Sequence, residues 1–170
     1  MPSFGFAHLS DIHLAGYAEG ALFDLDSDVR AELELDLERV TEEVGGLDAI
    51  LVAGDIAGKG LQREFDVAAT WVDSLCELLG APPERVYCVP GNHDITWDVI
   101  AADPVLDAVQ EQLLTCRVEE VAGRLEGMLS SGPHRGLLLA ALENYNAFAA
   151  RYGCGRTPFF GPPTVRVGWM

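Results

Sequence analysis

The sequence has 170 residues, of which 49% are hydrophobic, and its formal net charge is −16. This length and apolar fraction are typical of one globular domain with a buried core. The acidity makes a nucleic-acid partner unlikely, because such binding relies on lysine and arginine side chains that neutralise phosphates, but it is compatible with binding of cations.

The sequence also predicts where the protein is found. It has no apolar stretch of the length that crosses a membrane, and its start, MPSFGFAHLS, lacks the basic and apolar parts of a signal peptide. Its four cysteines are far apart and form no CxxC motif, which is typical of reduced thiols. We therefore expect a cytoplasmic protein that makes no membrane contact.

The first half of the chain alternates predicted strands and helices. Short apolar runs predict strands over 4–9, 49–53 and 85–89, and helical periodicity predicts helices over 28–44 and 61–79. The run 49–53 (AILVA) does not alternate with polar residues, as expected for a strand covered on both faces. This β-α-β-α-β order predicts an α/β fold built on a parallel sheet.

The second half is predicted to be mostly helical. Asp103-Pro104 is typical of a helix start. Apolar residues recur at helical spacing over 106–113, 118–129 and 138–152, with a turn-rich linker expected at 130–135. A further strand is expected to begin at Thr164. We interpret the chain as a single domain over 1–170, with a core over 1–100, a helical insertion or cap over 101–155, and the start of a strand within 156–170.

Polar side chains follow each of the three predicted strands. They are Asp11 and His13 after the first, Asp55 after the second, and Asn92, His93 and Asp94 after the third. The carboxyl ends of parallel strands share one edge, where open α/β sheets bind ligands. Asp11 and His13 are two residues apart, so an extended backbone would point both side chains the same way. This mixed set of oxygen and nitrogen donors suits Mn²⁺, Fe or Zn²⁺ better than Ca²⁺.

Each motif alone also has an ordinary explanation. A D-x-H sequence is usual in loops, and Gly-Asp or Gly-Asn after a strand is a common turn. An acidic α/β binding domain without any metal is therefore an alternative interpretation.

In order and spacing, the three motifs resemble those of a known family. HLSDIH (8–13), VAGDI (52–56) and VPGNHD (89–94) are similar to the D-x-H, G-D and G-N-H-D blocks of the calcineurin-like metallophosphoesterase superfamily. The resemblance implies a β-sandwich flanked by helices, of which this chain would hold a part, with a centre of two divalent metal ions (Mn, Fe or Zn). It implies metal-dependent hydrolysis of a phosphoester.

The resemblance also implies a role for each residue. The metal ligands would be Asp11, His13, Asp55 and Asn92. Asp55 would bridge the two ions. His93 would contact the phosphate and act as the acid toward the leaving oxygen, and Asp94 would orient the His93 imidazole.

The later histidine blocks of the family, including Gly-His-x-His, are absent. His8, inside the first predicted strand, is expected to be packed and hydrogen-bonded, and His134 is expected in a surface loop. The pattern predicts either the N-terminal portion of a longer enzyme or a naturally shortened form. In this chain alone, one weakly bound metal ion is the expectation.

The favoured interpretation is a phosphodiesterase that acts on a small (cyclic) nucleotide or a similar phosphodiester. The alternatives are a degenerate, non-catalytic module with a binding or regulatory role, and a nuclease of the same superfamily, which the negative charge disfavours. Beyond the phosphoester substrate, the expected partners are a second copy at the incomplete sheet edge or further fused domains.

Overall fold

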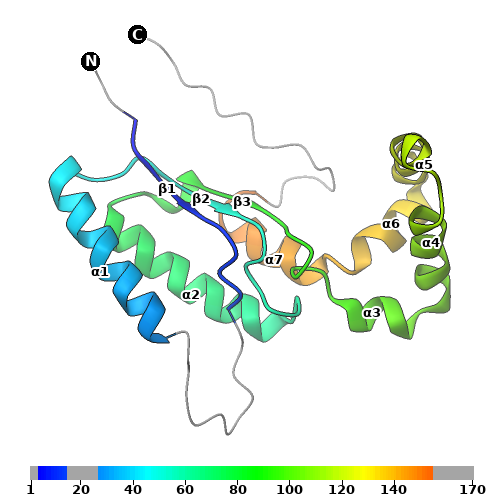
Figure 1. Ribbon diagram of the computed structural model, residues 1–170, viewed down its shortest axis with the longest axis horizontal. Helices are drawn as coiled ribbons and strands as arrows, with labels where there is room; N and C mark the ends of the chain where they lie inside the picture. Colours follow the sequence, from blue (N-terminus) through cyan, green and yellow to red (C-terminus); the bar gives the residue numbers. More distant parts are fainter. Residues whose placement is uncertain (1–3, 15–26, 155–170) are drawn as a thin grey trace, which may run out of the picture.

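The computed structural model describes residues 4–14 and 27–154 (Figure 1). Its parallel sheet has the strand order β1 (Phe6–Leu9), β2 (Ala49–Ala53) and β3 (Val86–Val89). Helices α1 (Ser27–Val44) and α2 (Gln62–Leu79) connect these strands, and a short 3-10 turn, η1 (Pro83–Arg85), precedes β3. The predicted α/β class and its β-α-β-α-β beginning are confirmed.

One face of the sheet carries the main core. The strand register places on it the buried side chains of Ala7, Leu9, Ile50, Val52, Val86 and Cys88. The apolar stripe of α2 packs against this face through Phe65, Val72 and Leu75, each 1% exposed or less. Helices α1 and α2 lie on this side of the sheet (Figure 1), so a layer of helices covers this face.

The described helices leave the opposite face of the sheet open. Phe6 and Val89 are exposed there, and Leu51 and Tyr87 are half-buried. His8 lies on the same face and is exposed, so the expectation of a packed His8 is wrong. The reason is the alternation of β1, which points Ala7 and Leu9 into the core and therefore Phe6 and His8 away from it.

A group of helices follows β3 and lies beside the sheet, away from α1 (Figure 1). These helices are α3 (Trp97–Ala102), α4 (Pro104–Leu114), α5 (Val118–Ser130) and α6 (Gly132–Ala140), and α7 (Glu143–Arg151) then returns to pack on α2. Asp103 caps α4 as expected, because its side chain accepts the backbone N–H groups of Val105 and Leu106. Ile100, Leu106 and Ala141 form a small second core.

Within the described parts of the chain, no helix is long and apolar enough to cross a membrane.

Three expectations for this half are corrected. The expected linker at 130–135 is largely the first turn of α6, since Pro133 lies near the helix start, where proline is tolerated. His134 is therefore exposed on a helix and not in a loop. The structure also contains α3, for which the sequence interpretation predicted no element. The helix predicted over 138–152 is broken at Ala141–Leu142 into α6 and α7. The strand expected from Thr164 lies outside the described residues.

Candidate metal centre

The segments that follow β1 and β2 run side by side past the end of the sheet. His13 N donates to the carbonyl of Asp55 at 2.9 Å, and Leu14 N donates to the carbonyl of Ile56 at 2.8 Å. Leu14 and Ala57 also form an isolated parallel bridge. This continued pairing brings His13 beside Asp55.

The segment after β3 packs directly on Asp55. A Cβ atom at Gly91 would lie 2.1 Å from Oδ1 and 2.4 Å from the backbone nitrogen of Asp55, so only glycine fits there. Gly54 has a φ of +82°, and a Cβ atom on it would lie 3.1 Å from the Cα atom and the backbone nitrogen of Gly91. The two glycines thus allow the Gly-Asp and Gly-Asn-His-Asp motifs to touch through their backbones.

Three candidate residues adopt left-handed backbone conformations. Asp11, His13 and Asp55 have φ values of 56°, 47° and 51°, and they are the non-glycine residues with positive φ in the described part of the chain. The expectation of an extended backbone from Asp11 to His13 is therefore wrong. Such conformations are disfavoured for residues with a Cβ atom and concentrate at functional sites, where the surrounding structure holds them.

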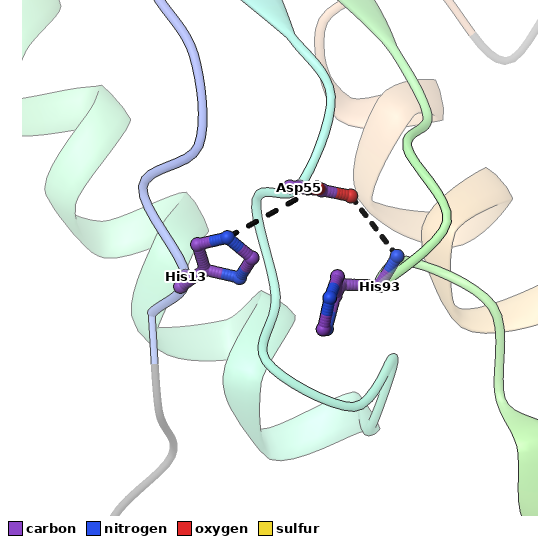
Figure 2. Close-up of side chains that lie close together, drawn as sticks. All are labelled: His13, Asp55 and His93. Carbon is purple, nitrogen blue, oxygen red and sulfur yellow. Dashed lines mark hydrogen bonds and ion pairs between the residues drawn. The ribbon is translucent and has the colours of Figure 1, made fainter.

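His13, Asp55 and His93 form a compact group that we call the donor cluster (Figure 2). One donor atom from each lies within 4.8 Å of the other two. Nε2 of His13 is 4.0 Å from Oδ2 of Asp55, and the two imidazole rings meet edge to face with centroids 4.6 Å apart. Two imidazole nitrogens and a carboxylate oxygen are donors that suit Mn²⁺, Fe or Zn²⁺, so the residues fit a divalent metal ion of this kind.

Asp55 is held in the donor cluster by the motif that follows β3. Its Oδ1 accepts the backbone N–H of His93 at 3.0 Å. Its side chain is 16% exposed, against 41% for His13, so Asp55 forms the inner wall of the cluster while the imidazoles face outward. This placement leaves the ring donors accessible to an ion and a substrate.

The other predicted ligands lie in the segments next to this cluster. Asp11 is exposed, and its carboxylate accepts the hydroxyl of Ser10. Asn92 is exposed in the loop that carries His93. The structure therefore groups three of the residues singled out from the sequence, His13, Asp55 and His93. The sequence interpretation did not count the His93 ring among the metal donors, whereas the structure places it beside the other two.

Asp94 is fully buried and binds backbone, not the His93 ring. Its two oxygens accept the N–H groups of Ala57 and Gly91, each at 2.8 Å. Burial raises the pKa of the Asp94 carboxyl, and these hydrogen bonds oppose the rise. The partner of Nδ1 of His93 is instead the carbonyl of Gly58, at 3.0 Å. The expectation that Asp94 orients the imidazole is corrected, because both of its oxygens join the two motifs together.

The sequence interpretation missed the residues that hold the loop containing Gly58. These are Glu64, Thr96 and Asn144. Glu64 had a readable signal, since an acid at the third position of a helix commonly reaches back to the helix start. Asn144 had none, because it lies 84 residues from its partner Gly60.

The chain matches the model of the calcineurin-like phosphoesterase family over residues 4–148. It belongs to that family. Members are metal-dependent phosphoester hydrolases, which agrees with a donor cluster of two imidazoles and a carboxylate.

A relative of this chain occurs in Bacillus subtilis (strain 168). It carries the name "Uncharacterized metallophosphoesterase-like protein YydB" and is 31% identical over 94 residues. The match covers 55% of this chain and 18% of the relative. The chain therefore spans a small share of that relative's length.

Proposed function

We propose that this phosphoesterase chain carries the metal-binding part of a phosphodiesterase that acts on a small nucleotide, cyclic or linear. The donor cluster at the carboxyl edge of the sheet supports the proposal most directly. The net charge of −16 favours a small substrate over a nucleic-acid polymer, whose binding would need many basic contacts.

The proposed roles follow the positions of the side chains. His13 and Asp55 would hold the metal, with Asp55 shared between two ions when both are bound. Asp11 and Asn92 would contribute oxygens from the rim. When bound, divalent ions lower the pKa of an attacking water and neutralise charge on the phosphoryl oxygens.

His93 would deliver the proton to the leaving oxygen. Because a carbonyl only accepts hydrogen bonds, the contact with Gly58 requires a proton on Nδ1. Nε2 is then the ring atom that is left to carry the transferred proton. A general acid of this kind typically contributes about 10²- to 10⁴-fold to the rate.

Hydrolysis of bis-p-nitrophenyl phosphate with added Mn²⁺ tests this function. The His93→Ala variant is expected to lose about 10²- to 10⁴-fold in kcat, and it should still bind Mn²⁺ through His13 and Asp55. Unchanged hydrolysis in the variant would remove the acid role, and lost Mn²⁺ binding would make His93 a ligand instead. A wild-type chain that binds Mn²⁺ but hydrolyses neither this ester nor cyclic nucleotides would favour the non-catalytic module.

A further inference from the structure

Residues 57–61, the second part of the connection between β2 and α2, are held by a buried carboxylate. We call this segment the β2 loop. Oε2 of Glu64 accepts the backbone N–H groups of Lys59 at 2.8 Å and Leu61 at 3.1 Å. Glu64 is only 3% exposed. A charged side chain is costly to bury unless hydrogen bonds compensate, so these two bonds are strongly favoured.

The contacts of Glu64 exceed what the start of α2 requires. The bond to Leu61 satisfies the backbone of the residue that caps the helix, which is an ordinary role for an acid at this position. The bond to Lys59 lies outside the helix and orders the β2 loop itself. Glu64 therefore acts on the loop as well as on α2.

A second set of contacts holds the same loop through Gly60. The carbonyl of Gly60 accepts the Thr96 hydroxyl at 2.7 Å and Nδ2 of Asn144 at 2.9 Å. Nδ2 of Asn144 also lies 3.2 Å from the Thr96 hydroxyl. Gly60 packs so tightly that a Cβ atom on it would be 2.6 Å from the carbonyl carbon of Ile95. Asn144 thus ties α7 to the β2 loop and to the segment after His93.

The carbonyl that holds the His93 ring belongs to this loop. Gly58 lies next to Lys59 and two residues before Gly60. The hydrogen bonds of Lys59 to Glu64 and of Gly60 to Asn144 therefore restrict the direction of the Gly58 carbonyl. That carbonyl accepts a hydrogen bond from the N–H group at Nδ1 of His93. In histidine, the hydrogen bond made by one ring nitrogen determines which of the two nitrogens carries the proton.

We propose that Glu64 and Asn144 are positioning residues for His93. By fixing the β2 loop, they keep a proton on Nδ1, bonded to the Gly58 carbonyl, so that Nε2 is the ring atom left to take up and deliver the proton of the reaction. The consequence for hydrolysis rests on the proposed function, whereas the proton position on the ring is a property of the metal-free chain.

The direct test is nitrogen-15 NMR of the histidine rings in the metal-free full chain, with the His93 signals assigned by His93→Gln. The wild type is expected to show neutral His93 protonated on Nδ1. In Glu64→Ala and Asn144→Ala, protonation on Nε2 should become substantial. Glu64→Gln should keep the wild-type signal, because its amide oxygen can accept the same two N–H groups.

Matched controls lie on the same helices. Glu77→Ala on α2 and Asn146→Ala on α7 remove the same side-chain types elsewhere on these two helices, and both should keep the wild-type His93 signal. If Glu64→Ala fails to fold, Asn144→Ala decides the outcome, since Asn144 is only half-buried. A wild-type His93 signal in folded Asn144→Ala would overturn the proposal.

Kinetics with Mn²⁺ extend the test to the reaction. Asn144→Ala is expected to lower kcat by about 10- to 100-fold with little change in KM. If the wild type hydrolyses nothing but the ring protonation shifts as expected, the positioning stands and the proposed function fails. If the wild type hydrolyses the ester and the ring protonation does not shift, the positioning alone fails.

Discussion

Asp55 links the two histidines of the donor cluster. Its Oδ1 accepts the backbone N–H of His93, and its Oδ2 faces Nε2 of His13. Its left-handed backbone and the missing side chain of Gly91 make both contacts available. The geometry of the site therefore also depends on Gly91, although this glycine has no side chain that could bind a metal ion.

The substitution Gly91→Ala tests this dependence. The new Cβ atom would lie 2.4 Å from the Asp55 backbone nitrogen, so Asp55 must move. We expect at least a tenfold loss of Mn²⁺ affinity, about 1.4 kcal/mol, measured by titration calorimetry. The matched control is Gly127→Ala in α5, where the Cβ atom meets open space and should slightly stabilise the helix. Equal Mn²⁺ affinity in both variants would contradict this account of Gly91.

Asp94→Asn tests the buried link between the two motifs. An amide has one accepting oxygen, so either Ala57 N–H or Gly91 N–H would face an NH₂ group. We expect the free energy of unfolding, measured by urea denaturation, to fall by about 1–3 kcal/mol. Asp98→Asn, at an exposed position on α3, should leave it nearly unchanged. A wild-type urea midpoint for Asp94→Asn would show that these two bonds contribute little.

The sequence indicated which residues gather at the sheet edge but not how their backbones turn. The motif positions predicted that His13, Asp55 and His93 would meet, because parallel strands end at one edge. The left-handed conformations of Asp11 and His13 were not readable, since residues with a Cβ atom rarely adopt them. The partner of the His93 ring was also unreadable, because a backbone carbonyl such as that of Gly58 leaves no side-chain signal.

At the scale of elements, α7 follows α3 to α6 along the chain and packs on α2 in the core. Phe65 of α2 packs against two aromatic rings of α7, with centroid distances of 6.2 Å to Tyr145 and 5.5 Å to Phe148. Tyr152, which follows α7, donates to the carbonyl of Ala69 and to Asp73 on α2. This packing holds Asn144, in the first turn of α7, against the β2 loop.

Phe65→Ala should therefore weaken both the core and the attachment of α7. Removing this fully buried ring is expected to cost about 3–5 kcal/mol in the free energy of unfolding, measured by chemical denaturation. The control is Val67→Ala, since Val67 is 36% exposed on the same helix and should change stability by about 0.5 kcal/mol or less. Similar losses in the two variants would mean that the aromatic contact does not hold α7.

The elements differ in how well the sequence predicted them. Strands and long helices of the first half were readable, because each is a compact apolar run or a clear stripe. The break between α6 and α7 was not, since Leu138, Leu142 and Tyr145 continue the helical spacing across it. The exposure of His8 depends on which face of the sheet the helices cover, and the sequence of β1 alone does not indicate which face that is.

At the scale of the whole molecule, the net charge of −16 is the dominant long-range property. Glu42 and Glu43 lie exposed in the last turn of α1, where negative charge also opposes the helix dipole and no basic residue compensates. Repulsion among like charges destabilises a compact chain. Cations in solution or at the donor cluster should therefore stabilise the protein.

Salt should accordingly raise the melting temperature. Between about 0.01 and 0.1 M NaCl the screening length falls from about 30 to about 10 Å, which should raise Tm by several degrees in calorimetry. Glu42→Gln with Glu43→Gln should raise Tm in low salt and reduce its dependence on NaCl. A Tm that does not depend on salt would show that the acidic side chains are well solvated and repel one another little.

The central claim is that the donor cluster binds a divalent metal ion. Calorimetric titration of the metal-free chain with Mn²⁺ tests it most directly, with Asp55→Asn as the test variant and Asp98→Asn as the control that removes an equal charge. We predict Mn²⁺ binding by the wild type and by Asp98→Asn, and at least tenfold weaker binding by Asp55→Asn. Absence of binding to the wild type, or equal affinity in all three proteins, would contradict the claim.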